Sequence, residues 1–222
     1  DVVKRAIGKA AYFNSGAPSL RIWHQNDLAQ HVGKGLRCAY PFFELNRFKK
    51  VEIHHLMRQD IIFAPSEWAK SVLQTLPGVP RNIQIANPGV DMRTFGIGLY
   101  DHPRDHQDTV FLNVGKWEVR KGHLELIQAF NAAFEKSDKV RLVMACHNPC
   151  FRTKEEADRY NQGWERYAKT SKLGDKIHVL TERLPSQKDV ANLMAVADCG
   201  VFPSKAEGWG LESAEMMATG KF

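Results

Sequence analysis

The stretch CGVFPSKAEGWGLESAE, residues 199–215, decides the expected fold of this chain. It begins with a short apolar run, passes through a turn and ends where a helix should start. Glycines at 208 and 210 remove the β-carbon where a ligand would approach the main chain. The helix that follows turns its free N–H groups and positive dipole end toward that ligand. The stretch therefore predicts a strand, an anion-binding turn and a helix.

Two carboxylates, Glu207 and Glu215, bracket this turn. We expect Glu207 on the loop and Glu215 in the first turns of the helix, where a carboxylate can accept hydrogen bonds from ribose and sugar hydroxyls. Acidic residues near a helix N-terminus also stabilise the dipole without any ligand, and that explanation stays open. The helical spacing of Leu211, Met216 and Met217 predicts core positions. We interpret the carboxylate pair as a cradle for a nucleotide sugar.

The composition is that of an ordinary soluble globular protein. The chain has 222 residues, of which 43% are hydrophobic and 25% charged. No apolar run approaches the roughly 18 to 20 residues that span a bilayer, and residues 1–5 lack the apolar core of a signal peptide. We therefore expect a cytoplasmic location.

The formal charge of +6 is spread unevenly. Residues 1–91 hold 12 Lys and Arg against 7 Asp and Glu, whereas residues 92–222 hold 19 against 18. The basic first part fits an anionic acceptor or peripheral contact with a membrane surface, and a solvated basic surface explains it equally well. The basic residues form no stripe with interleaved aromatics, so no nucleic acid partner is expected.

The four cysteines, Cys38, Cys146, Cys150 and Cys199, are expected to be free thiols, mostly buried. Cys146, His147 and Cys150 could supply three metal ligands, which leaves a zinc or thiol protein as a minor alternative. No second cluster completes a tetrahedral site, so we expect no metal.

Strand and helix patterns alternate along the chain. Ser66 is expected to cap the helix after it, and Leu124, Ile127, Phe130 and Phe134 are spaced as a core-facing stripe. The alternation predicts an α/β fold with parallel sheets flanked by helices. Strands are expected at residues 20–24, 60–66, 83–86, 109–114, 140–146, 177–180 and 199–203, and helices at 42–58, 67–76, 123–134, 153–172 and 187–197.

The segment 93–108 carries glycines, a proline and clustered charges with little apolar periodicity. We interpret it as a linker. Residues 1–92 then form a first domain and residues 109–222 a second.

A second candidate turn, GKWEVRKG at residues 115–122, follows the strand at 109–114. Ligands of open α/β sheets collect at the carboxyl ends of strands, where this turn should lie. Lys116 and Lys121 are well placed to neutralise a diphosphate, although a solvated basic loop is the alternative. Because the Glu207 loop also leaves the carboxyl end of a strand, both turns could converge on one ligand.

With these motifs in order, the sequence resembles the nucleotide-sugar-dependent, retaining glycosyltransferases of family 4, also called group 1. This family has two Rossmann-like domains in the GT-B arrangement. The resemblance covers about residues 20–222. Its matching stretches are residues 60–68, residues 87–91 with Phe95, residues 113–122 and residues 203–215.

The resemblance implies roles for particular residues. Lys121 and, after Gly115, Lys116 would hold the donor diphosphate. Lys116 stands where arginine is usual, which keeps the charge but loses the planar fork. Glu215 would bind the ribose hydroxyls, and His24 is our candidate for the histidine beside the reacting centre.

The signature stretch receives the remaining roles. Glu207 would lie by the donor sugar, and the Gly208 turn with main-chain groups of Trp209, Gly210 and Leu211 would contact sugar or phosphate. Of all these residues, we assign His24, Lys121 and Glu207 to catalysis.

The implied activity is transfer of a sugar from a nucleoside diphosphate sugar to a hydroxyl of a glycan, glycolipid or other acceptor, with retention of anomeric configuration. No covalent nucleophile, metal or cofactor is implied beyond the donor substrate. Both domains are expected to be incomplete relative to the family, so the chain alone could be inactive. A non-catalytic nucleotide-binding fragment, and a phosphorylase or epimerase of the same build, remain alternatives.

Overall fold

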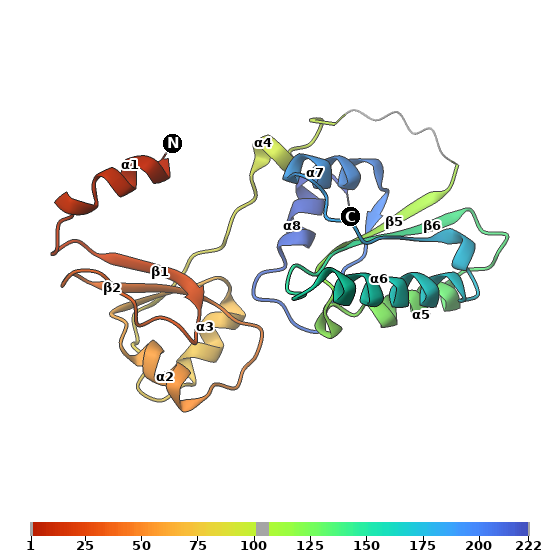
Figure 1. Ribbon diagram of the computed structural model, residues 1–222. Helices are drawn as coiled ribbons and strands as arrows, with labels where there is room; N and C mark the ends of the chain where they lie inside the picture. Colours follow the sequence, from red (N-terminus) through yellow and green to blue (C-terminus); the bar gives the residue numbers. More distant parts are fainter. Residues whose placement is uncertain (1, 101–106, 222) are drawn as a thin grey trace. The chain divides into compact units, whose positions relative to one another are not determined.

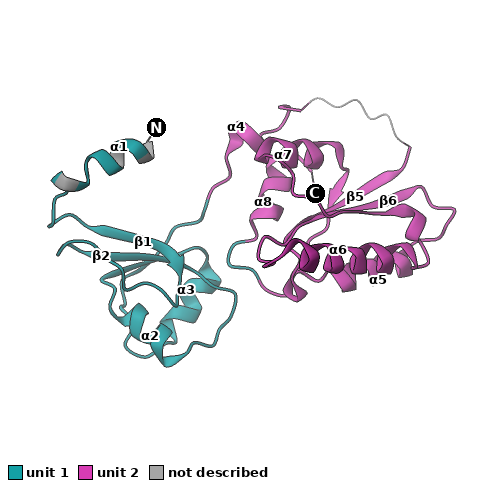
Figure 2. Cartoon of the chain, viewed as in Figure 1, with its two compact units in different colours: residues 1–88, 207–209 teal, residues 89–206, 210–222 magenta. Residues whose placement is uncertain are grey.

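The computed structural model describes residues 2–100 and 107–221. The chain divides into two compact units (Figure 2). Unit 1 comprises residues 1–88 and 207–209, and unit 2 comprises residues 89–206 and 210–222.

Unit 1 is built on a parallel sheet of strand order β1-β2-β3-β4. Helices α2 and α3 pack beside this sheet (Figure 1). Ser66 caps α3 by accepting a hydrogen bond from the Ala69 main-chain N–H at 3.1 Å, as the sequence predicts. The elements of unit 1 are α1 (Val2–Gly8), η1 (Ala10–Tyr12), β1 (Ser19–His24), β2 (Arg37–Phe42), α2 (Lys50–Met57), β3 (Ile61–Ala64), α3 (Glu67–Gln74) and β4 (Ile83–Ile85).

Residues 37–58 differ from the expectation, which placed a helix over residues 42–58 and no strand before it. The helix α2 begins only at Lys50, and residues 37–42 form a strand between β1 and β3. Pro41 disfavours a central strand because it has no N–H to donate. The structure accommodates it because β2 pairs with β3 only through Cys38 and Ala39, before the proline is reached.

Unit 2 has a parallel sheet of order β7-β6-β5-β8. Helices α5 and α6 lie on one face of this sheet, and α4, α7 and α8 lie on the other (Figure 1). The elements of unit 2 are α4 (Met92–Phe95), β5 (Thr109–Gly115), η2 (Val119–Lys121), α5 (His123–Ala133), β6 (Val140–Cys146), α6 (Lys154–Lys169), η3 (Gly174–Lys176), β7 (Ile177–Leu180), α7 (Gln187–Val196), β8 (Cys199–Gly200) and α8 (Leu211–Ala218).

The sheet of unit 2 is covered on both faces, which is the usual condition of a parallel sheet. One core cluster, under α5 and α6, includes Ile127, Phe130 and Leu142, and the other includes Leu112 and Met216. The alternating burial along β6 assigns every second side chain to the first cluster.

Two side-chain expectations for the helices were only partly right. On α5, Ile127 and Phe130 are buried and Phe134 packs against the core, but Leu124 is 42% exposed, and Leu126 is buried in its place. On α8, Met216 is buried, whereas Leu211 and Met217 are exposed. The buried residues at positions 123, 126, 127 and 130 lie three and four apart and share one face, and Leu124 lies outside that face, which explains the error on α5.

The segment expected to be a linker, residues 93–108, contains structure. Asp91 caps the short helix α4, and Phe95 at its end is buried in the second core cluster of unit 2. The division between the units falls at Pro88 and Gly89. Part of the expected linker, residues 101–106, lies outside the described residues.

No helix in the described part of the chain is both long enough and apolar enough to cross a membrane.

Gly122, which joins η2 to α5, generates a prediction. Its φ is +72°, and a β-carbon built there would lie 2.4 Å from the Pro203 carbonyl oxygen. We expect Gly122→Ala to lower the free energy of unfolding by about 2 kcal/mol or more, because both the left-handed backbone and the clash oppose a side chain.

Gly163 in α6 is the matched control. A β-carbon there meets nothing within 4 Å, so Gly163→Ala should raise the free energy of unfolding by roughly 0.5–1 kcal/mol. Urea denaturation measures both changes. Equal effects of the two substitutions would contradict the special role of Gly122.

Candidate functional site

The strand order of unit 2 marks one place where a ligand crevice is expected. From β5 the chain moves outward through β6 to β7 and then crosses to β8, on the other side of β5. In open α/β sheets, ligands bind at the carboxyl ends of strands where the strand order reverses. That point lies between the ends of β5 and β8, which lead into the turn at 115–122 and the loop at 201–210.

Strand β8 is shorter than expected, ending at Gly200, yet side chains hold it firmly to β5. The Val201 N–H donates to the Leu112 carbonyl oxygen at 2.8 Å. The Asn113 side-chain amide donates to the Val201 carbonyl oxygen at 2.6 Å. Asp198 accepts a hydrogen bond from the Val110 N–H at 2.8 Å. The start of the 201–206 loop is therefore fixed relative to β5.

The turn after β5 is tied to the loop after β8. The Lys205 N–H donates to the Arg120 carbonyl oxygen at 2.8 Å. The Arg120 guanidinium donates in return to the Ala206 carbonyl oxygen at 2.6 Å. With the close approach of Gly122 to Pro203, these contacts place residues 118–122 and 203–206 side by side.

Lys121 forms the central ion pair of this corner. Its Nζ lies 2.6 Å from Oε1 of Glu212, in the first turn of α8. The side chain of Lys121 is only 10% exposed and that of Glu212 24%. The cation near position 120 and the helix after position 210 therefore meet directly.

Lys116 is held in a different ion pair. Its Nζ lies 2.7 Å from Oε1 of Glu118, and Arg120 contacts the other oxygen of that carboxylate at 2.9 Å. The hydrogen bond to Glu118 raises the pKa of Lys116. Desolvation opposes ionisation of Glu118, but its two cationic neighbours lower its pKa overall. Lys116 and Arg120 thus share one carboxylate, and the three groups together keep one net positive charge.

Glu215 is a buried carboxyl, one helical turn beyond Glu212. Burial raises the pKa of Glu215 to about 7, and the negative charge of Glu212 adds to this effect. At neutral pH the protonated carboxyl, which can donate a hydrogen bond, and the carboxylate, which only accepts, are therefore both populated.

His123, the first residue of α5, is buried as well. Burial lowers its pKa to about 4, with nearby Lys121 contributing in the same direction. Its imidazole is therefore neutral at physiological pH.

Glu212 and Glu215 border a cavity of about 360 Å³ at the carboxyl edge of the sheet. Gly115 forms part of the wall, and Glu212 and Glu215 project from α8. The remaining lining residues come from α4, the ends of β5, β6 and β7, the loop after β7, and the starts of α7 and α8: Phe95, Val114, Ala145, His147, Glu182, Arg183, Leu184, Pro185, Ser186, Gln187, Val190 and Leu211.

The structure places the sequence-predicted residues of unit 2 as follows. The cavity is lined by Gly115, Leu211 and Glu215. Lys121 does not line it, but it forms an ion pair with Glu212, which does. Lys116 does not line it and pairs with Glu118 instead. Gly210 adopts a left-handed conformation, with φ of +79°, directly before α8.

The other predicted residues belong to unit 1. Glu207, Gly208 and Trp209 are grouped with that unit. His24 ends β1 and is exposed, with Nδ1 3.2 Å from the Phe42 carbonyl oxygen. Their catalytic and donor-binding roles stay predictions.

Sequence reasoning did not place Glu212, His147 or Arg183 at this crevice, and it considered His147 only as a metal ligand. The carboxyl ends of β6 and β7 lead directly to His147 and to the loop holding Arg183, so strand position could have indicated both. Glu212 resembled one of the acidic residues common in the first turn of a helix, and nothing in the sequence marked Lys121 as its partner.

A metal site at the cysteines finds no geometric basis. Among residues 2–100 and 107–221, no three His, Cys, Asp or Glu side chains are grouped to hold an ion. Cys146 is buried and donates to Asn113, and burial raises the pKa of its thiol.

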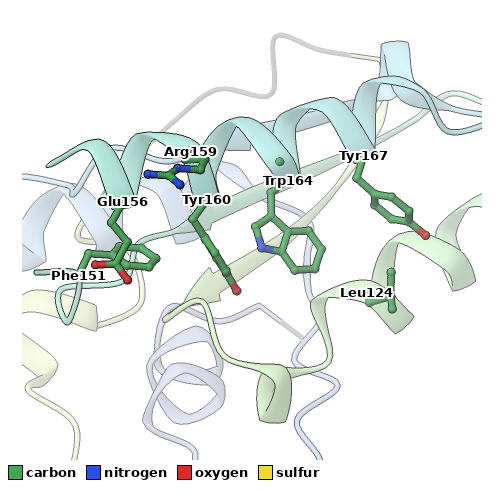
Figure 3. Close-up of a pocket in the computed structure, with 8 residues that line it drawn as sticks. Leu124, Phe151, Glu156, Arg159, Tyr160, Trp164 and Tyr167 are labelled. Atoms are coloured by element: carbon green, nitrogen blue, oxygen red, sulfur yellow. The ribbon is translucent and has the colours of Figure 1, made fainter. Parts of the chain in front are cut away.

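A larger cavity of about 610 Å³ lies along α6 (Figure 3). Tyr160, Trp164 and Tyr167 point from α6 toward the side where Leu124 of α5 lies. Trp164 stacks on the buried Trp117 at a ring-centroid distance of 4.7 Å. Among the described residues that line this cavity, Arg159 is the single cation, so an anionic ligand has less to bind here than at the corner of Lys121.

The fold and the cavity together define an α/β protein with a polar crevice at the switch point of a parallel sheet. The family model described as "Glycosyl transferases group 1" matches residues 108–222, more than half of the chain. The chain belongs to this family, as the sequence motifs indicated.

Known proteins support this placement. The chain is 27% identical over 142 residues to a GDP-mannose:cellobiosyl-diphosphopolyprenol alpha-mannosyltransferase of Xanthomonas oryzae, an alignment covering 64% of this chain and 33% of the relative. Among solved structures, it is similar to HepE of Anabaena in complex with UDP-glucose. The TM-score is 0.63 and the identity 18%, over 83% of this chain and 51% of that one.

A second similar structure is an E. coli protein titled trehalose-6-phosphate and bound with UDP-2-fluoro glucose. The TM-score is 0.72 and the identity 12%, over 96% of this chain and 58% of that one. The chain thus spans about a third of the curated relative's length and just over half of the lengths of these two structures. The structural similarities confirm the expected GT-B fold.

The perturbed Glu215 generates a prediction. Its pKa is about 7 in the folded protein against 4.5 ordinarily, so the folded state binds a proton that the unfolded state has lost. Stability from this group must therefore fall as pH rises from about 4.5 through 7, by about 3 kcal/mol in all. Glu215→Gln should remove that fall and be more stable than the wild type at pH 8.

Urea denaturation at pH 5, 6, 7 and 8 measures this difference. His123 is present in both chains, so its opposite contribution cancels. The exposed Glu155 supplies the control, since Glu155→Gln should leave the pH dependence unchanged. Parallel curves for the wild type and Glu215→Gln would contradict the perturbed carboxyl.

Proposed function

We propose that this chain carries the donor site of a hexosyltransferase, which moves a sugar from a nucleoside diphosphate sugar to an acceptor hydroxyl with retention of anomeric configuration. Family membership supports sugar transfer in general. The nature of the donor, the retention and the hexose are parts of the proposal.

One observation carries the proposal most directly. The 2.6 Å contact of Lys121 with Glu212 brings the turn after β5 and the helix after β8 to one point at the switch crevice. A cation that already binds a carboxylate there can bind a phosphate oxygen in the same way. The N-terminus of α8, preceded by the glycine turn, adds main-chain N–H groups and a positive dipole.

The proposed chemistry depends on electrostatics. Cleavage of the bond between sugar and diphosphate leaves negative charge on the leaving group. A lysine with a side chain 10% exposed can stabilise that charge more strongly than a solvated one. Glu215, on the same cavity wall, can accept a hydrogen bond from a ribose hydroxyl once it has lost its proton.

The named donors of similar proteins support the donor class. The Xanthomonas relative is named for GDP-mannose, and the HepE structure contains UDP-glucose. Both are nucleoside diphosphate hexoses, and they differ in base and sugar. We therefore propose the class and leave base and sugar to experiment.

Nucleotide binding gives a first test. At a hundredfold excess over its dissociation constant, UDP or GDP should stabilise the chain by roughly 2.7 kcal/mol. Thermal melting with each nucleotide measures this effect. Lys121→Ala should abolish most of the stabilisation, whereas Lys136→Ala, which removes an exposed lysine of the same unit, should leave it intact. Equal stabilisation of both variants would refute the role of Lys121.

Turnover gives a second test. In a full-length enzyme containing this chain, Lys121→Ala should reduce sugar transfer roughly a hundredfold, as expected for loss of one charge-stabilising group. Assays of nucleoside diphosphate release with and without acceptor also separate the alternatives. A phosphorylase or epimerase would not need the nucleotide-sugar donor, and a non-catalytic binder would show melting shifts without turnover. Normal transfer by the variant would rule out the assigned role.

A further inference from the structure

We propose that Glu212 is a placeholder for the donor diphosphate: in the ligand-free protein its carboxylate takes the position beside Lys121 that the diphosphate occupies when the donor binds. This inference rests on the proposed function. It adds that a carboxylate of the protein itself competes with the diphosphate for Lys121 and so sets the affinity of the same site for the donor.

The position of Glu212 is the first ground. Its Oε1 lies 2.6 Å from Lys121 Nζ, at the distance of a charge-assisted hydrogen bond. The same oxygen lies 3.7 Å from the place where a β-carbon on Gly115 would be, which is an ordinary van der Waals distance. The carboxylate therefore lies beside the end of β5, and Gly115 and Glu212 both line the cavity.

The energetics of Lys121 are the second ground. An ammonium group whose side chain is 10% exposed is costly without an anion, because burial removes most of its hydration. Glu212 meets that need before any ligand arrives. A diphosphate brings more negative charge than one carboxylate, so it can replace Glu212 at the cation.

The surroundings of Glu212 favour such an exchange. Glu215 stands three residues along the same helix, and the charge of Glu212 helps to raise its pKa. The negative charge of Glu212 therefore disfavours ionisation of Glu215 on the same cavity wall. Glu212 is also more exposed than its lysine partner, 24% against 10%, so its side chain is the freer of the two to turn toward solvent.

The test is isothermal titration of the 222-residue chain with UDP and GDP. Glu212→Gln keeps an oxygen that can accept from Lys121 but removes the competing charge. We expect it to bind the better of the two nucleotides roughly fivefold more tightly than the wild type, which corresponds to about 1 kcal/mol. Uridine and guanosine, which have no phosphate, should bind both chains equally.

Matched variants separate a placeholder from a general charge effect. Glu155→Gln removes an exposed carboxylate of the same unit that does not line this cavity, and it should change UDP and GDP affinity less than twofold. In a protein that already carries Lys121→Met, Glu212→Gln should not increase the affinity for UDP or GDP. Should Glu212→Gln fail to fold in thermal melting, Glu212→Met keeps the side-chain length without the charge and is expected to show the same gain.

The failures are distinguishable. If the wild type binds UDP or GDP and Glu212→Gln binds it equally or more weakly, the placeholder is refuted while the proposed function stands. An equal increase in affinity from Glu155→Gln also refutes it. If neither the wild type nor any variant binds either nucleotide at millimolar concentration, the donor site itself is wrong, and the placeholder fails with it.

Discussion

The pairing of β8 with β5 is the constraint on which the rest of unit 2 depends. The strand contributes only Cys199 and Gly200, too few residues for main-chain hydrogen bonds alone to fix its direction. Main-chain bonds of Asp198 to Val110 and of Val201 to Leu112 extend the pairing, and the side chains of Asn113 and Asp198 add two more hydrogen bonds. Because β8 arrives by the crossover that reverses the strand order, this short ladder brings α8 and its carboxylates to the end of β5. Without the pairing of β8 with β5, the other strands would still form a sheet, but α8 would not be brought to the end of β5 and there would be no crevice at the switch point.

The region around that cavity holds ionisable groups that would destabilise the fold if each were buried alone. Lys121 is buried, but Glu212 neutralises it. Glu215 is buried too, and the pKa near 7 shows how burial and its acidic neighbour penalise its charged form. Polar groups held in a low-dielectric setting interact more strongly with a ligand than solvated ones do. The same burial that weakens the fold therefore strengthens recognition, as is common at functional sites.

Much of this arrangement could be predicted from the sequence, and the failures have physical causes. The apolar run at 109–114, the Ser66 cap and the two glycine turns each encode local structure, so they indicated strands, helices and the corner of the site. Strand β2 was missed because Pro41 argues against a strand unless the pairing pattern is known. Glu212 was missed because its importance comes from Lys121, ninety-one residues away, and no local pattern records that contact.

The stack of Trp117 on Trp164 gives unit 2 an intrinsic optical label. Trp117 follows Lys116 in the turn after β5 and is 1% exposed, and its ring lies within 10° of parallel to that of Trp164. Two indoles held so closely and so nearly parallel couple electronically, and the signal depends on their distance and tilt. The near-ultraviolet circular dichroism of this pair therefore reports on the geometry of the turn, and a change in its conformation can be followed without attaching any dye.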